Sequence, residues 1–334
     1  MHGVFSEPMA GPSNHPWGRG SVESLRGIAR LRSLWQCAFI RRSTVPSPPP
    51  VVPAPLEAGV RELTLLAQFT DTHVTDPATA EVLYADHNAR LTAAIASVNA
   101  ESPRVDAVIA TGDLAQWGTP REYQELAELL APLVAPVLPL PGNHDDGRLL
   151  RGCFPDHPWA DAEHSSWVAD VGEVRIIGLD STRAGESGAE LDAERLAWLD
   201  AALGAEHRGP TLLAMHHPPF RSGIGWMDEA GFIGLDAFIE VVSAHRIDRV
   251  LCGHLHRPMS AVVGGHLAEV GPSTAVHVEL DLAAGAPRRV ILDPIGYRLL
   301  AISPDDAEHT DWTIVGHTRY VGTGQLAFEP DWSD

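Results

Sequence analysis

The feature that most constrains the fold of this chain is a regular alternation of short apolar segments with longer amphipathic ones after residue 60. Short apolar runs suit buried strands, whereas an apolar residue every three to four positions suits helices packed on a sheet. Helices are predicted at 86–99, 120–130, 192–203 and 235–244, and strands at 63–69, 105–110, 136–140, 174–179, 212–215 and 249–252. The runs around Val262 and at 276–280, 289–292 and 298–302 alternate like antiparallel strands. This order predicts a layered α/β domain, with the proline-containing 136–140 strand at a sheet edge or an abrupt exit.

Residues 1–60 differ in composition from the rest of the chain. They are net positive, whereas the remainder is strongly acidic. Residues 46–55 hold six prolines in ten positions, which favours an extended polyproline conformation and opposes packing as helix or sheet. We therefore predict a disordered, basic, proline-rich leader over 1–60 and a single folded domain over 61–334. A targeting or partner-binding arm and a mis-set start codon both remain open for the leader.

Composition excludes several classes of protein. The 24 basic residues are all arginine, which rules out a Schiff-base lysine and a phosphate-loop lysine. A net charge of −20 argues against a nucleic-acid partner, because such binding needs a dense cationic surface. The three cysteines have no paired spacing, and no apolar run approaches the ~18 residues of a membrane span. A cytoplasmic protein without a membrane partner is therefore expected. The oligomeric state stays open, and a homodimer is one option.

Polar motifs follow directly after five of the predicted strands. They are Asp71-Thr-His73, Gly112-Asp113, Gly142-Asn143-His144-Asp145, His216-His217-Pro218 and Gly253-His254-Leu255-His256. Open α/β sheets collect ligands at the carboxyl ends of their strands, so these motifs are expected to converge. Residues two apart on an extended chain point the same way, which would pair the side chains within Asp-x-His and His-x-His. The glycines allow sharp turns and close approach of the backbone.

The residue types in these motifs indicate a metal site. Carboxylate, imidazole and amide ligands suit Mn, Fe, Zn or Co better than Ca or thiolate-binding ions. With one bridging carboxylate, the candidates form two sites of four protein ligands each. Any single motif is ordinary turn chemistry, but all five in order are not a coincidence. The seven candidates are Asp71, His73, Asp113, Asn143, His216, His254 and His256.

This ordered set resembles the signature of the calcineurin-like metallophosphoesterases over residues 63–280. The resemblance implies a four-layer αββα sandwich with two divalent metal ions (Mn, Fe or Zn). It assigns one ion to Asp71, His73, Asp113 and His256, and the other to Asp113, Asn143, His216 and His254, so that Asp113 bridges. His144 would be the acid–base residue and, with Asn143, would contact the substrate. His217 would contact the substrate or orient a ligand, unless it only packs under Pro218.

Departures from related groups narrow the expected activity. Purple acid phosphatases carry glycine and tyrosine where this chain has His73 and Gln116, and protein phosphatases carry an Asp-Arg pair that is missing at Gln116-Trp117. The segments 113–123 and 215–219 are similar to class III cyclic nucleotide phosphodiesterases, and 220–228 resembles the related glycerophosphodiesterases. Trp117 and Trp226 are candidates either to stack on a base or to anchor a loop.

The predicted function is metal-dependent hydrolysis of small-molecule phosphodiesters. Cyclic 3′,5′-nucleotides such as cAMP come first, and glycerophosphodiesters are the alternative. Two cations make a protein nucleophile unnecessary, and an imidazole suits protonation of the leaving oxygen near neutral pH. A non-catalytic scaffold is expected to have lost ligands, which this chain has not, and a nuclease would need a basic track that the acidic domain does not offer.

Overall fold

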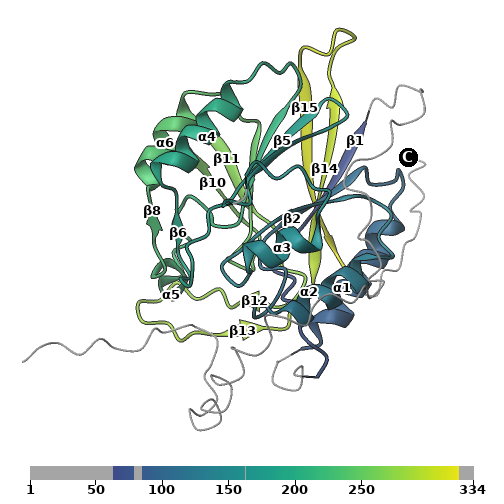
Figure 1. The fold of residues 1–334 in the computed structure, drawn as a ribbon, viewed down its shortest axis with the longest axis vertical. Coiled ribbons are helices and arrows are strands. Elements are labelled where there is room, and N and C mark those ends of the chain that lie inside the picture. The colour runs from purple at the N-terminus through teal and green to yellow at the C-terminus, as the bar shows by residue number, and fades with distance from the viewer. Residues whose placement is uncertain (1–62, 79–84, 162, 323–334) are drawn as a thin grey trace, which may run out of the picture. The chain divides into compact units, whose positions relative to one another are not determined.

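The computed structural model describes residues 63–78, 85–161 and 163–322, so the predicted leader lies outside the described residues. Two β-sheets face each other, and helices cover their outer faces (Figure 1). This is the four-layer αββα arrangement that the sequence predicts. In the described part of the chain, no helix has the length and apolar character needed to cross a membrane.

The first sheet holds the strands that lead into the first three polar motifs. Its order is β15 (Trp312–Tyr320), β14 (Gly296–Pro304), β1 (Thr64–Phe69), β2 (Ala107–Thr111) and β3 (Val137–Leu140). The last three run parallel, β14 pairs antiparallel with β1, and β15 pairs antiparallel with β14. The outer layer consists of α1 (His87–Asn99), α2 (Pro120–Leu130) and the short α3 (Gly147–Cys153).

The second sheet carries the two histidine motifs. Its order is β10 (Met259–Val263), β11 (His266–Val270), β9 (Arg249–Cys252), β7 (Thr211–Met215), β5 (Val174–Leu179) and β4 (Trp167–Val171). Its outer face is covered by α4 (Ala193–Gly204) and α6 (Leu235–Ser243). The remaining short elements are α5 (Gly225–Asp228), β6 (Ala189–Glu190), β8 (Phe232–Ile233), β12 (His277–Val278) and β13 (Val290–Ile291).

The sheets are held together by an apolar layer between them. Leu66 and Ile109 of the first sheet belong to one buried cluster with Ile176, Leu212 and Leu251 of the second. Central strands have apolar side chains on both faces, because one face meets the other sheet and the other meets helices. That explains why their sequences read as continuous apolar runs.

Local sequence signals locate the helix starts well. Asp86 caps α1 by accepting a hydrogen bond from the Ala89 amide, and Thr119 and Glu122 form a capping box at the start of α2. The strand predicted at 136–140 is indeed an edge strand. The C-terminal part is less regular than predicted, because β11 pairs in parallel with β9 and β12 has only two residues.

One buried histidine makes stability depend on pH. His157 is 4% exposed, and its ring centroid lies 4.3 and 4.9 Å from those of Trp159 and Trp167. Within the described part of the chain, neither of its ring nitrogens has a hydrogen-bond partner. Burial lowers the pKa of His157 to about 3. Below the ordinary pKa of ~6.5 the unfolded chain takes up a proton that the folded chain does not, so stability falls as the pH falls.

We expect His157→Leu to remove this sensitivity. Between pH 7 and pH 5, wild type should lose about 2 kcal/mol more free energy of unfolding than the variant. Urea unfolding at both pH values measures the difference. His266→Leu is the control for loss of a histidine as such, because both ring nitrogens of His266 contact backbone carbonyls, unlike those of His157. Parallel pH profiles of wild type and His157→Leu would contradict the expectation.

Candidate metal centre

The five motifs lie at the carboxyl ends of β1, β2, β3, β7 and β9, as the sequence predicts. The loops after β1 and β2 are tied together by backbone hydrogen bonds from Asp71 N–H to Gly112 O and from His73 N–H to Asp113 O. The loop after β9 joins them through the His254 N–H, which donates to the Asp71 carboxylate at 3.0 Å. Segments far apart in the sequence therefore share one site.

The backbone at the site is strained where the side chains meet. Asp71, His73, Asp113, His254 and His256 all have positive φ, between 45° and 69°. Among the described non-glycine residues only one other, in the 305–311 loop, does so. Such conformations are unfavourable by about 1–3 kcal/mol each and cluster at functional sites. The expected extended Asp-x-His and His-x-His segments are therefore wrong, because these aspartate and histidine residues have left-handed rather than extended backbone φ.

Two glycines allow the loops to approach each other, as predicted. A Cβ at Gly142 would lie 2.2 Å from Asp113 Oδ1, and a Cβ at Gly253 would lie 2.0 Å from Thr70 Oγ1. Any side chain at either position would push a loop away from the site.

The first group of ligand atoms comes from Asp71, His73, Asp113 and His256, all buried, with their atoms within 4.8 Å of one another. His256 Nε2 lies 3.3 Å from Asp71 Oδ1, and His73 Nε2 lies 3.6 Å from Asp113 Oδ2. The two Nε2 atoms are 3.0 Å apart. These are the four residues that the resemblance implies for one ion.

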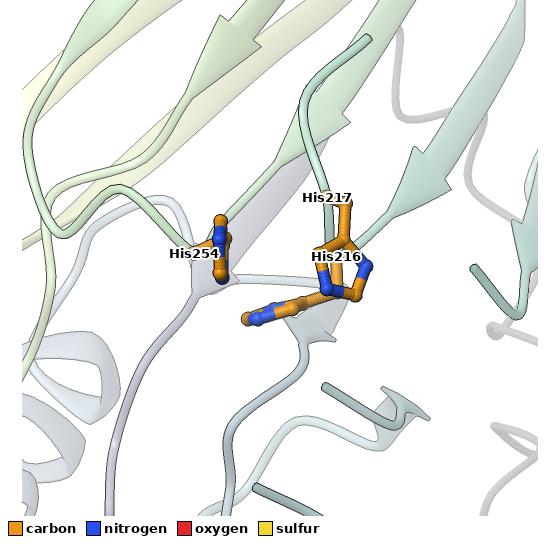
Figure 2. Close-up of side chains that lie close together, drawn as sticks. All are labelled: His216, His217 and His254. Atoms are coloured by element: carbon orange, nitrogen blue, oxygen red, sulfur yellow. The ribbon is translucent and has the colours of Figure 1, made fainter. Parts of the chain in front are cut away.

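The second group gathers around Asn143. Its Oδ1 lies 3.2 Å from His216 Nε2 and 2.9 Å from His254 Nδ1, and His216 Nε2 lies 3.4 Å from Asp113 Oδ2. Figure 2 shows His216 and His217 after one strand and His254 after another, with their rings grouped together. The four residues implied for the other ion are therefore neighbours, and His217 is a third imidazole beside them.

Backbone carbonyls orient two of the imidazoles. His216 Nδ1–H donates to Thr111 O at 2.8 Å, and His256 Nδ1–H donates to Val276 O at 2.9 Å. In the neutral rings the Nε2 lone pairs then face the carboxylates, an arrangement that repels unless a cation or a proton lies between them. This donor set fits divalent metal ions, and the carbonyls orient it as partners of metal-binding histidines do.

The electrostatics of the cluster agree with that fit. Burial opposes ionisation of Asp113, but the imidazoles, with His216 foremost, hold its pKa well below the usual range. Burial, reinforced by neighbouring imidazoles, lowers the pKa of His254 to about 3 and that of His73 well below its usual value. Burial also acts to lower the pKa of His216, but Asp113 outweighs it and raises that pKa to about 9. A cation bound at this cluster would therefore compete with protons for the imidazole and carboxylate groups.

His144 lies beside the cluster rather than in it. Its backbone N–H donates to Asp113 Oδ1 at 2.8 Å, and its ring Nδ1–H donates to Gln116 O at 2.7 Å. The ring centroid is 4.8 Å from that of His73. With Nδ1 engaged, Nε2 is the nitrogen that can exchange a proton with a bound molecule.

Asp145 is a structural residue of the site to which the sequence argument gave no role. Its carboxylate accepts hydrogen bonds from the backbone of Gly142, Leu114 and Ala115 and from the Tyr123 hydroxyl, at 2.9–3.0 Å. It thereby joins the loops that carry the bridging candidate and the Asn-His pair. Its place in the Gly-Asn-His-Asp motif was the available signal.

In the described part of the chain, two cavities that share no lining residue border the cluster. One, of about 260 Å³, is mostly apolar and is lined by His217, His254, Phe220, Met227 and Phe232. His217 is held there by a 2.9 Å contact between its Nδ1 and Ser181 Oγ. The other cavity, of about 550 Å³, is polar, and its lining includes Asn143, Arg148, Arg151, Asp180 and Thr182.

Comparison with known proteins identifies relatives of this chain. The calcineurin-like phosphoesterase profile matches residues 64–258. A probable glycerophosphodiester phosphodiesterase, GpdQ, of Arcobacter nitrofigilis is 30% identical over 261 residues, covering 77% of this chain and 93% of the relative. A probable cyclic nucleotide phosphodiesterase of Rhodopseudomonas palustris is 37% identical over 243 residues, covering 71% and 88%. The purple acid phosphatase PPD1 of yellow lupin shares the fold, with a TM-score of 0.55 at 15% identity over 84% of this chain and 54% of that one.

Proposed function

The chain belongs to the calcineurin-like phosphoesterase family, and from this premise we propose that it hydrolyses small-molecule phosphodiesters, with 3′,5′-cyclic nucleotides such as cAMP as preferred substrates. The observation that carries the proposal is the convergence of all seven candidate ligands into two adjoining groups beside His144. A cyclic nucleotide phosphodiesterase relative, 37% identical, supports the cyclic substrate.

The proposed ligand sets follow these groups. Asp71, His73, Asp113 and His256 would hold one divalent ion, and Asp113, Asn143, His216 and His254 would hold the other. Mn, Fe and Zn are the proposed metals, because all three accept mixed oxygen and imidazole ligands. Bound together, two such ions would supply charge neutralisation at the phosphoryl oxygens and a more acidic attacking water.

The residues around the ions would orient the substrate and handle the proton. His217 lines the apolar cavity and Asn143 lines the polar one. Together these two side chains would position the phosphodiester between the two cavities. His144 Nε2 would donate a proton to the leaving ester oxygen, since its Nδ1 is engaged by Gln116 O. Asp145 would keep the His144 loop aligned with Asp113 through its hydrogen bonds.

Glycerophosphodiesters are the second candidate. An acyclic diester has two separate ester groups, and the cluster has a cavity on each of two flanks, one beside His217 and one beside Asn143. The GpdQ relative at 30% identity supports this alternative.

The remaining expectations are carried forward as proposals from the sequence. They are a catalytic domain over 61–334, a cytoplasmic location, no nucleic-acid or membrane partner, and an assembly that a homodimer would satisfy.

A substrate panel tests the proposed function. Cyclic nucleotides, glycerophosphodiesters and an aryl phosphodiester should be assayed with Mn, Fe and Zn. We expect the highest kcat/KM on a cyclic nucleotide. Higher kcat/KM on glycerophosphodiesters would favour the second candidate, and no hydrolysis of any diester with any metal would refute the proposed function.

A further inference from the structure

Trp117 is an unusually exposed aromatic residue beside the proposed proton donor. Its side chain is 52% exposed, although tryptophan is normally well buried in folded proteins. The other tryptophan singled out from the sequence, Trp226, packs against the core under the second sheet. An exposed indole at the rim of a site is available to a ligand rather than to the fold.

The loop that carries Trp117 is held firmly. The Trp117 N–H donates to Glu122 Oε2 at 3.0 Å, and the Thr119 N–H donates to the same oxygen at 2.9 Å. Gly118 has a φ of +62°, and a Cβ there would lie 2.9 Å from His144 O. The loop therefore packs closely on the His144 segment, which fixes the backbone from which the indole extends.

Trp117 and His144 also share a link through Gln116. The carbonyl of Gln116, the residue before Trp117, accepts the His144 Nδ1–H. The two rings have centroids 6.5 Å apart and planes tilted by 51°, so the indole is not stacked on the imidazole. A group attached to the oxygen that His144 is proposed to protonate would therefore lie within reach of the indole.

We propose that Trp117 is a specificity-determining residue on which a planar ring of the substrate, such as a nucleobase, stacks. The inference rests on the proposed phosphodiesterase function. It extends that function to a preference for substrates whose alcohol part carries an aromatic ring over those without one. Stacking on an aromatic side chain tolerates different bases, because every base has a π-face. The site would therefore prefer nucleotides over glycerophosphodiesters without selecting strongly among bases.

The test compares Trp117→Leu with wild type on substrates with and without a ring. We expect kcat/KM on cAMP to fall by about 5- to 100-fold, mainly through KM, and kcat/KM on glycerophosphoethanolamine to stay within about twofold. Trp117→Phe keeps a ring and should recover part of the loss. Trp312→Leu is the control for loss of an indole. Trp312 pairs with Pro304 past the N-terminal end of β1, whereas Asp71 follows the C-terminal end of that strand.

A binding measurement keeps this test separate from turnover. Calorimetry of 5′-AMP and of ring-free glycerol 3-phosphate should show weaker binding of 5′-AMP alone in Trp117→Leu. Equal losses on both ligands, or no loss on either, would overturn the stacking role while leaving the proposed function intact. If wild type hydrolysed no diester, the proposed function would fail, and the 5′-AMP comparison would still decide the role of Trp117.

Discussion

Replacing Asp113 by alanine is expected to abolish phosphodiester hydrolysis and to leave the protein with neither metal ion bound. Asp113 Oδ2 is 3.6 Å from His73 Nε2 and 3.4 Å from His216 Nε2, so the same oxygen faces both ligand groups. Two-metal hydrolysis depends on the pair of ions, so kcat should fall by more than about 10³-fold. Elemental mass spectrometry of the purified variant measures the metal content directly.

Asp71→Ala is the matched comparison, because Asp71 belongs to the first group alone. That variant should lose mainly one ion. Asp113→Asn preserves the shape of the side chain and separates loss of metal from loss of fold, with circular dichroism as the check. If the two alanine variants lost metal equally, the proposed division of the ligands would be wrong.

His144→Ala is expected to keep both metal ions and to lose about 10²- to 10⁴-fold in kcat, the usual contribution of a positioned general acid. The ring lies beside His73 and is tied to Gln116 O, but it is not one of the grouped ligands. Metal content and turnover, measured on the same preparation, test both parts of this expectation.

The loss in His144→Ala should also depend on the leaving group. A ribose oxygen or glycerol leaves poorly without a proton, whereas nitrophenolate leaves readily as an anion. The variant should therefore be damaged far more on cAMP or a glycerophosphodiester than on an aryl phosphodiester. Equal damage on both would mean that His144 positions the phosphate or holds a metal, and His217 would be the next candidate for the acid.

The chemistry of the candidate site was largely predictable from the sequence. Metal coordination demands particular residue types, and the motifs follow apolar runs at whose carboxyl ends ligands collect. The structure shows that these ends belong to two facing sheets. The helix starts at Asp86 and Thr119 were predictable for a similar reason, since capping depends on residues within one turn of each other. Local patterns thus determined the secondary structure, the layered fold and the identity of the candidate ligands.

Other features depend on contacts between distant segments, and only the tertiary structure decided them. The carbonyls of Thr111 and Val276 orient His216 and His256, and neither partner is visible in a motif. Trp117 and Trp226 look alike in sequence, yet one is exposed beside His144 and the other packs against a core. The direction of a side chain depends on which loops pack together and on backbone angles that the packing imposes. The sequence alone therefore determined which residues are candidates for this site, and the packing of its loops decided how their side chains are oriented.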